Sequence, residues 1–302
     1  MGFLKKYISV LRLRTIPLSL SGVLLGCMLA YADFHVRPAV VAFILLTAVF
    51  LQILSNVSNE LGDFLRGNSS GHERSASLAL KSGELTAGGL EMLVRIMVVL
   101  SVASGLAMIY FSFGTIFSLD AFVLMIFGYM SIRAAMKYTL GRNPYGYRGL
   151  GDVYVFVFFG LVAVMGSYFV CTHTFGTAKL LLPAVSAGAL GMAVLNVNNL
   201  RDIEPDRAVR VTVAGKLGEH GARIYQTVLV AVAWAAMIAY AMLCFYDPWH
   251  YLFVLSLPLF IWHLAGVWKN SSAGLDRYLP QLVLSALIFC LLAGGGFLIY
   301  LI

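Results

Sequence analysis

The sequence predicts an all-α, polytopic membrane protein with about nine transmembrane helices around a central cavity that opens to the cytosol. Apolar residues make up 60% of the 302 residues, charged residues only 12%, and the mean hydropathy is +0.87. A soluble globular domain is far less apolar than this. Several apolar runs also reach the roughly 20 residues that a helix needs to cross a bilayer. Composition and run length together give the fold class.

Nine apolar stretches are long enough to span, and each is expected to form one helix. They lie at about 16–33, 38–58, 88–111, 115–138, 153–172, 180–200, 223–245, 249–268 and 280–301. The polar segments between them are all shorter than a typical domain of about 50 residues or more. We therefore expect residues 1–302 to form a single integral-membrane domain.

Lysine and arginine residues are concentrated on one side of the predicted spans. They precede the first span and follow the second, fourth, sixth and eighth, whereas the opposite connections hold only Arg37 and Lys179. The positive-inside rule then places the N-terminus in the cytosol and the C-terminus outside. The net charge of +7 is accordingly attributed to membrane orientation and to anionic lipids or substrates, not to nucleic acid. Three cytosolic loops, at about 64–87, 140–151 and 201–222, are expected to cap a site.

A polar segment ends the second apolar stretch. On a helix, the spacing of Asn56, Asn59, Glu60 and Asp63 puts two amides and two carboxylates on one face. Polar groups at membrane depth are costly, so this face must meet protein, water, metal or substrate rather than lipid.

A second polar segment ends the sixth stretch. Asn199, Asp202 and Asp206 share a face if the helix continues that far. Residues Asn59–Asp63 and Asn198–Asp202 both read Asn-x-Leu-x-Asp at a helix end on the same side of the membrane. Five residues can agree by chance, but duplicated helical halves facing one cavity would also produce this repeat.

Taken alone, either segment is as typical of a solvated helix end as of a site. Taken together, they predict two helices that direct carboxylate and amide oxygens into one cavity. Such hard ligands suit Mg²⁺, which keeps several waters and is completed by substrate phosphates. Nearby basic residues could neutralise the remaining phosphate charge, namely Arg66, Arg74, Lys81, Arg207, Arg210 and Lys216.

Two further segments have open interpretations. Residues Lys137–Asp152 form a predicted tight loop rich in glycine, tyrosine and arginine, which suits either a substrate or anchoring at the membrane interface. The segment Arg12–Pro17 opens the first span, and a positive-inside anchor is at least as good an explanation for it as a substrate contact.

These segments resemble those of the UbiA-type intramembrane prenyltransferases. Asn59-Glu-Leu-Gly-Asp63 is similar to the first aspartate-rich motif of that family, and Asp202-Ile-Glu-Pro-Asp206 to the second. Within that family, three segments resemble the branch that uses 1,4-dihydroxy-2-naphthoate. They are Leu51–Asn59, Asn143–Asp152 and Asn198–Arg207. The resemblance extends from the opening motif at residue 11 to the last helix.

The sequence departs from the family pattern at several positions. Glu60 stands where the family usually has aspartate, which keeps a carboxylate but lengthens it by a methylene. Gly67 stands where the wider family has a third aspartate, and Leu13 replaces a usual proline. In the family, the first arginine of this loop is expected to be followed by a Gly-Pro pair and a second arginine. The loop Arg74–Gly83 lacks both, so the resemblance assigns a diphosphate contact only to Arg74 in this loop.

The resemblance implies a Mg²⁺-dependent enzyme of the bacterial plasma (inner) membrane. It would transfer a polyprenyl group from polyprenyl diphosphate to 1,4-dihydroxy-2-naphthoate with loss of CO₂ and diphosphate, giving demethylmenaquinol in menaquinone biosynthesis. The metal would be held by Asn59, Glu60, Asp63, Asn199, Asp202 and Asp206. The substrates would be bound by Asn59, Asn198, Asn199, Arg74, Arg207, Lys216 and Tyr145. The catalytic residues would be Asp63, Asp202, Asp206, Tyr138 and Asp152.

Two alternatives stay open on the sequence. The same fold could use another acceptor, such as 4-hydroxybenzoate, homogentisate or haem. A secondary transporter would explain the repeat and the intramembrane polar groups, although its site would be expected near the membrane midplane rather than at one side.

Overall fold

The computed structural model of the protein describes residues 10–66, 85–206, 210–245 and 247–299. Within these ranges the regular elements are all helical, apart from one isolated bridge between Arg148 and Val211. Nine helical stretches of this described part are long and apolar enough to cross a membrane, which confirms the predicted all-α class. They run Leu13–Asp33, Pro38–Leu65, Ala87–Phe113, Leu119–Lys137, Gly151–Thr172, Ala178–Arg201, Val213–Leu243, Pro248–Lys269 and Gly274–Leu298.

The long helices follow one another along the chain with short turns between them. The first half contains α2 (Ile16–Asp33), α3 (Pro38–Leu65), α5 (Ala87–Phe113) and α6 (Leu119–Lys137). One rod then joins α7 (Gly151–Val155), the π-helical η3 (Phe156–Gly166) and α8 (Ser167–Thr172). The second half contains α9 (Leu181–Arg201), α10 (Ile203–Asp206), α11 (Val213–Leu243), α12 (Leu257–Lys269) and α13 (Tyr278–Leu298). The remaining elements of the described chain are short 3₁₀ helices. They are η1 (Leu13–Thr15), η2 (Tyr145–Tyr147), η4 (Ala178–Leu180), η5 (Pro248–Ser256) and η6 (Ser272–Arg277).

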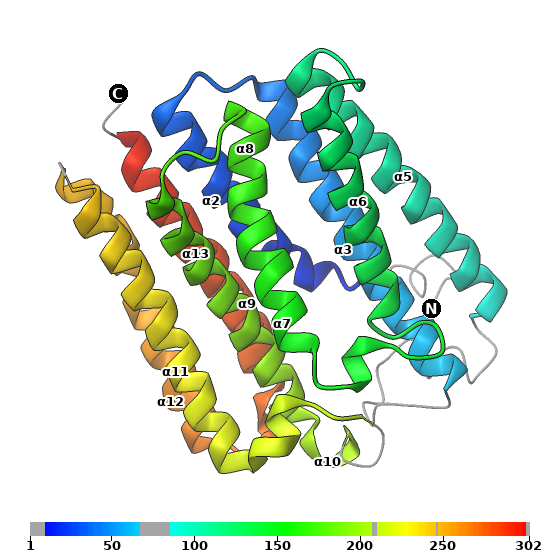
Figure 1. Ribbon diagram of the computed structural model, residues 1–302. Coiled ribbons are helices and arrows are strands. Elements are labelled where there is room, and N and C mark those ends of the chain that lie inside the picture. Colours follow the sequence, from blue (N-terminus) through cyan, green and yellow to red (C-terminus); the bar gives the residue numbers. More distant parts are fainter. Residues whose placement is uncertain (1–9, 67–84, 207–209, 246, 300–302) are drawn as a thin grey trace.

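The helices form one bundle with two flanks. Helices α3, α5 and α6 lie on one flank and α11 and α12 on the other, with α2, α9, α13 and the α7–α8 rod between them (Figure 1). The largest core joins side chains of α2, η3, α9, α11, α12 and α13, and a second core lies around α3 and α5. Helix α10 lies at the end of the bundle where α3 also ends, called here the α10 end (Figure 1).

Helix α9 is the most enclosed of the nine spans because its side chains are small. Alanine, glycine and serine occupy most of the positions from 184 to 193, so neighbouring helices can approach its backbone closely. The tightest approach is to η3, where a Cβ added to Gly160 would lie 2.5 Å from the Ala184 carbonyl oxygen and 2.7 Å from the Gly188 Cα. The absence of side chains at this crossing therefore sets the position of α9.

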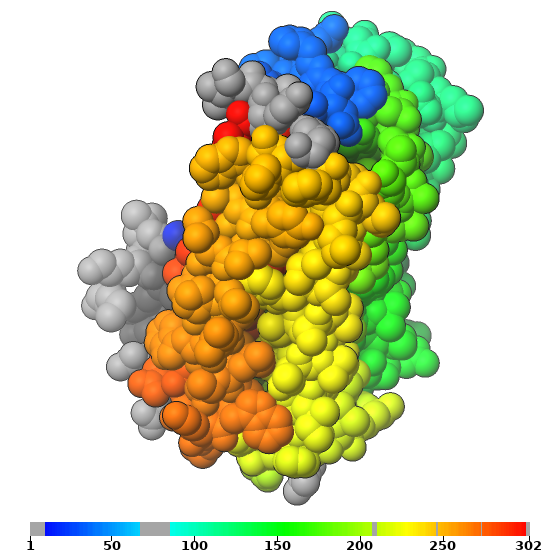
Figure 2. Space-filling view, turned by 90° about the vertical axis from the view of Figure 1, so that its left-hand side faces the viewer, coloured from blue at the N-terminus to red at the C-terminus, as the bar shows by residue number. Residues whose placement is uncertain are grey.

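The outer surface of the bundle is apolar, as a lipid-facing surface must be. Figure 2 shows the flank on which α11 and α12 lie side by side. These two helices expose Ile224, Val228, Val232, Ile261 and Trp262. The exposure of such large side chains agrees with a protein that is embedded in a membrane.

Two helix boundaries differ from those expected. Helix α3 continues to Leu65 instead of ending near 58, so the first polar segment is fully helical. Helix α11 begins at Val213, ten residues before the apolar run, because Thr212 caps it through the Gly215 amide and Gly218 (φ +70°) then kinks it. A count of apolar residues could not detect this polar first part.

Replacing Gly160 by alanine should destabilise the protein, by about 1–3 kcal/mol, because the new methyl group would overlap the backbone of α9. Thermal unfolding in detergent measures this as a lower melting temperature. Gly105→Ala is the matched control, since a Cβ on Gly105 would have no neighbour within 4 Å. Equal melting temperatures for the two variants would contradict the close approach.

Candidate active site

Asn56, the first member of the polar face on α3, anchors the N-terminal segment. Its Nδ2 donates to the Leu11 carbonyl oxygen (2.8 Å) and to Thr15 Oγ1 (3.0 Å), while Gln52 Nε2 donates to its Oδ1 (3.1 Å). Because Asn56 is buried and both its donors are used, it holds η1 against α3 and serves the fold rather than a ligand.

The two carboxylates on this face are paired with different parts of the chain. Glu60 is buried and forms an ion pair with Arg12, which lies just before η1. Asp63 Oδ1 accepts a hydrogen bond of 2.5 Å from the Tyr147 hydroxyl in η2. The first polar segment, called here the first acidic segment (Asn59–Asp63), thus contacts both the N-terminal segment before α2 and the loop of residues 138–150.

The 138–150 loop is also fastened to α3 by Thr139 and Arg66. Thr139 Oγ1 lies 2.9 Å from the Ser58 carbonyl oxygen and 3.3 Å from Asn59 Oδ1. The Arg66 guanidinium donates to the Thr139 and Gly141 carbonyl oxygens and lies 5.0 Å from the centroid of the Tyr147 ring. Arg66 therefore serves to fix the loop rather than to stand free for a phosphate.

The second acidic segment keeps a helical register through the break between α9 and α10. The Asp202 amide donates to the Asn198 carbonyl oxygen (3.2 Å), and the Asp206 amide to the Asp202 carbonyl oxygen (2.9 Å). As predicted from the spacing, Asn199, Asp202 and Asp206 are thus carried by one nearly continuous helical path, and all three are buried.

Arginines accompany both carboxylates of this segment. Arg201 binds Asp202 through two nitrogens, Nε to Oδ1 (2.9 Å) and Nη2 to Oδ2 (2.6 Å). Asp206 Oδ2 lies 2.7 Å from Arg210 Nη2. Burial raises the pKa of Asp206, and the Arg210 charge and hydrogen bond lower it; burial prevails, so this pKa lies above its usual value.

Tyr138 stands between the two segments. Burial raises the pKa of its phenol; Arg210 opposes this rise, and the carboxylates of Asp63, Asp152 and Asp206 add to it. The phenol therefore interacts electrostatically with carboxylates from α3, α7 and α10 at once, and it stays protonated at neutral pH. Asp63 in turn interacts electrostatically with Arg210, in agreement with α3 and α10 ending on the same side of the bundle (Figure 1).

An aromatic stack continues from Tyr138 along the start of the α7–α8 rod. The Tyr138 and Tyr145 rings meet edge to face at 5.3 Å, and Tyr145 stacks on Tyr154 at 3.7 Å. Burial also raises the pKa of Tyr145, whose hydroxyl donates to the Ala134 carbonyl oxygen. The buried Asp152 accepts a hydrogen bond from the Tyr225 hydroxyl at 3.0 Å. This surface offers aromatic faces next to carboxylates.

The donor set suits a hard cation that keeps water. Asn199 is 3% exposed, and its Oδ1 has no hydrogen-bond partner although a buried amide oxygen needs one. Among the described residues, no three side chains of the His, Cys, Asp and Glu types stand close enough to cage an ion. Mg²⁺ does not require such a cage, since it binds one or two carboxylates plus waters and phosphates.

The other predicted substrate residues are less well placed. Arg74 and Arg207 lie outside the described residues. Asn198 Oδ1 accepts from Arg201 Nη2 at 3.1 Å. Lys216 is exposed in the first turn of α11, with its Nζ near Gly149.

Sequence reasoning missed Arg201 and Tyr147 as members of this region. Arg201 could have been found, because a cation directly before an aspartate in a buried segment needs an anionic partner. The Tyr147–Asp63 and Arg12–Glu60 contacts join residues 84 and 48 positions apart, and no local pattern signals them.

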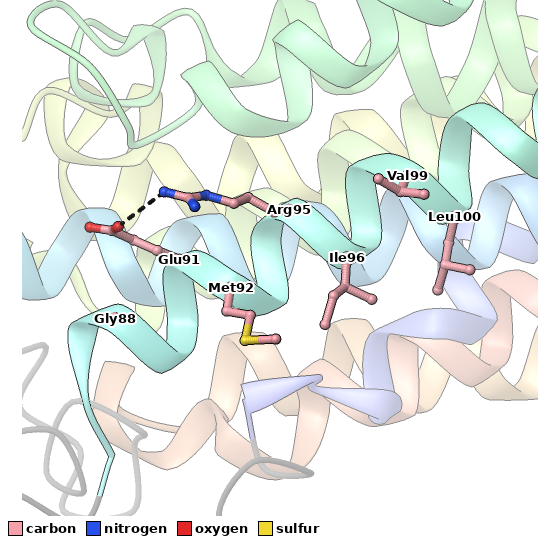
Figure 3. Close-up of a pocket in the computed structure, with 7 residues that line it drawn as sticks. All are labelled: Gly88, Glu91, Met92, Arg95, Ile96, Val99 and Leu100. Carbon is pink, nitrogen blue, oxygen red and sulfur yellow. Dashed lines mark ion pairs between the residues drawn. The ribbon is translucent and has the colours of Figure 1, made fainter.

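A surface groove lies elsewhere, along α5. Figure 3 shows its lining residues, all from that helix, with an ion pair of 3.8 Å between Glu91 and Arg95. Most of these side chains are exposed on the flank of the bundle. The groove is therefore separate from the acidic segments and belongs to the lipid-facing surface.

Comparison with known proteins identifies the family of the chain. Residues 19–284 match the UbiA prenyltransferase family. The chain belongs to this family. The 1,4-dihydroxy-2-naphthoate octaprenyltransferase of Haemophilus influenzae is 36% identical over 98% of this chain and 96% of its own. The Escherichia coli protein of the same name is 38% identical over 84% of this chain and 82% of its own.

A solved structure shares the family fold. The apo structure of a UbiA homologue from Aeropyrum pernix aligns over 100% of both chains with a TM-score of 0.70 and 16% identity. At that identity the likeness concerns the fold alone, and it agrees with the predicted helical membrane architecture.

Asn56→Ala should lower thermal stability more than Asn59→Ala does. The first change removes the hydrogen bonds of Asn56 with the Leu11 carbonyl oxygen, Thr15 and Gln52, at a cost of about 1–3 kcal/mol. Among the described residues Asn59 has only the 3.3 Å contact with Thr139. Melting temperatures in detergent compare the two variants. A larger loss in Asn59→Ala would show that Asn56 is not the anchor.

Proposed function

We propose that this protein transfers a polyprenyl group from polyprenyl diphosphate to 1,4-dihydroxy-2-naphthoate, with loss of CO₂ and diphosphate. The names of its relatives from two bacteria support this choice of acceptor over 4-hydroxybenzoate, homogentisate or haem. In the reaction the allylic carbon–oxygen bond breaks and its electron pair leaves with the diphosphate. A ring carbon of the acceptor then bonds to the allylic carbon, and the electrons of the lost carboxylate carbon bond return to the ring. The product is a demethylmenaquinol, which belongs to menaquinone biosynthesis.

One observation carries the proposal: the acidic ends of α3 and α10 lie at the same end of the bundle (Figure 1), and their carboxylates both interact electrostatically with Tyr138. Tyr138 interacts with both Asp63 and Asp206, which are separated by 143 positions in the chain. A secondary transporter would be expected to place such groups near the membrane midplane. The position at one end suits a lipid diphosphate whose head group lies at the membrane surface.

The two acidic segments would hold the diphosphate through Mg²⁺, which when bound stabilises the leaving group. Asp63, Asp202 and Asp206 are its candidate carboxylate ligands, with Asn199 Oδ1 as an available neutral oxygen. Glu60 is a variant ligand, one methylene longer than aspartate. Asn59 sits beside Thr139 on the same face of α3.

The aromatic stack beside the acids would receive the acceptor. Tyr138 and Tyr145 present faces that stabilise positive charge on an allylic carbon, because the face of an aromatic ring is electron-rich. The raised pKa of Tyr138 keeps its hydroxyl available as a hydrogen-bond donor. Asp152 would orient Tyr225 or the acceptor through its buried carboxylate.

We further infer that the α10 end faces the cytosol, which places the C-terminus outside the bacterial inner membrane. The helix ends and loops at this end carry Arg12, Arg14, Arg66, Arg148, Arg201, Arg210, Lys216, Arg223, Lys269 and Arg277. Arg37 and Lys179 are the described basic residues in the opposite connections. The positive-inside rule supports this orientation.

Asp63→Asn and Asp202→Asn should each lower turnover by about 10²-fold or more while the fold is retained, since each removes a charge that stabilises the leaving diphosphate. Product formation from labelled acceptor measures turnover, and the melting temperature reports the fold. Glu91→Gln, on the lipid-facing side of α5, is the control and should stay near wild type. Wild-type turnover in both aspartate variants would remove the metal assignment.

EDTA should abolish prenylation of 1,4-dihydroxy-2-naphthoate, and added Mg²⁺ should restore it, because the carboxylates alone repel a diphosphate. The assay uses purified protein, a series of polyprenyl diphosphates and each of the four acceptors in turn. Prenylation of one of the other three acceptors alone would change the assigned substrate. Solute flux without diphosphate release would favour a transporter.

A further inference from the structure

Arg201 is held by more acceptors than a surface arginine usually finds. Its guanidinium contacts both carboxylate oxygens of Asp202 and also Asp276 Oδ1, through Nη1 at 3.2 Å. Arg201 Nη2 also donates to Asn198 Oδ1, at 3.1 Å. The Arg201 side chain is 8% exposed, whereas that of Asp276, in η6, is 63% exposed. One cation thus bridges a buried carboxylate and a solvated one.

The bridge conflicts with the role of Asp202 as a ligand. A carboxylate that accepts two hydrogen bonds from one guanidinium presents both oxygens to that arginine. Each oxygen keeps a second lone pair, but the guanidinium charge so close to it repels a cation, and weakening one of these bonds therefore favours binding of the metal. Moving Arg201 away entirely would leave a buried positive charge without a partner, which is more costly still.

Asp276 resolves this conflict because it binds a different edge of the guanidinium. The Asp276 contact uses Nη1, while the Asp202 contacts use Nε and Nη2. Arg201 can therefore release Asp202 and remain paired with Asp276. Arg14 interacts electrostatically with both Arg201 and Asp276, so Asp276 has a second cation near it.

We propose that Arg201 is a positioning residue that exchanges partners: it occupies Asp202 in the empty enzyme and is retained by Asp276 when Asp202 binds Mg²⁺–diphosphate. This inference rests on the proposed function, since it requires a metal at the acidic segments. It assigns to η6 and Asp276, outside both acidic segments, a part in setting the affinity for the metal.

The exchange predicts opposite effects for two variants on one measurement. The probe is Mg²⁺ with inorganic diphosphate, and the readout is the Mg²⁺ concentration that gives half of the maximal thermal stabilisation. Arg201→Lys keeps the charge but loses the fork that holds Asp202, so it should lower this concentration about threefold. Asp276→Asn leaves Arg201 with Asp202 as its only carboxylate partner, so it should raise the concentration by about the same factor.

Two controls separate the exchange from a general charge effect. Glu204→Gln removes one exposed negative charge close to Asp202 and should raise the Mg²⁺ requirement less than Asp276→Asn does. Asp276→Glu keeps the carboxylate and should restore the wild-type requirement. Melting temperatures without Mg²⁺ show whether each variant is folded.

The outcomes distinguish this inference from the proposed function. If wild type is stabilised by Mg²⁺ but both variants raise the requirement, Arg201 supports the site without exchanging partners, and the inference is wrong. Equal rises in Asp276→Asn and Glu204→Gln would also overturn it. If wild type shows no Mg²⁺-dependent stabilisation, the metal assignment and the exchange both fail.

Discussion

Much of the arrangement of this protein depends on the need to give each carboxylate at the end of an apolar bundle a partner. Burying an ionised carboxylate costs several kcal/mol even after the protein relaxes, so every buried acid must have a partner. Asp202 and Asp206 have local partners in Arg201 and Arg210, whereas the partners of Glu60 and Asp63 come from distant segments and are Arg12 and Tyr147. Satisfying the acids therefore also places the N-terminal segment and the 138–150 loop.

Helix α9 gives these pairs a fixed frame. Its small side chains let η3 pack directly against it, and a buried chain of polar groups ties it to the far flank. Asn196 Nδ2 donates to Gln226 Oε1 (2.9 Å), Gln226 Nε2 lies 3.1 Å from His263, and His263 Nδ1 lies 2.9 Å from Gln281 Oε1. Hydrogen bonds between membrane helices resist sliding because unpaired polar groups in lipid are costly. The second acidic segment begins one turn after Asn196, so this chain fixes its height in the bundle.

The features that depend on local sequence were predicted, and those that depend on distant pairing were not. The nine spans follow from apolar run length, and the helical register of Asn199, Asp202 and Asp206 follows from their spacing. The start of α11 was misplaced, because caps and the Gly218 kink act on a polar stretch. The partner of Asp63 depends on how the 138–150 loop folds back onto α3, which no periodicity in the sequence encodes.

The same pairing suits cations that would share the site with the proposed metal, and those paired with Asp202 and Asp206 are arginines. Mg²⁺ and a substrate diphosphate bring charges that largely cancel, so the protein's own acids still need their cations after loading. Each cation must therefore stay close while giving up some of its contacts. A guanidinium can do so because its five donors lie on separate edges, as Arg201 shows by contacting Asp202 and Asp276 at once. An ammonium group has three donors, but its charge is concentrated at one strongly hydrated point and it lacks the planar fork that pairs with a carboxylate. Pairing with buried acids and making room for the proposed metal thus both require arginines that can keep one partner while releasing another.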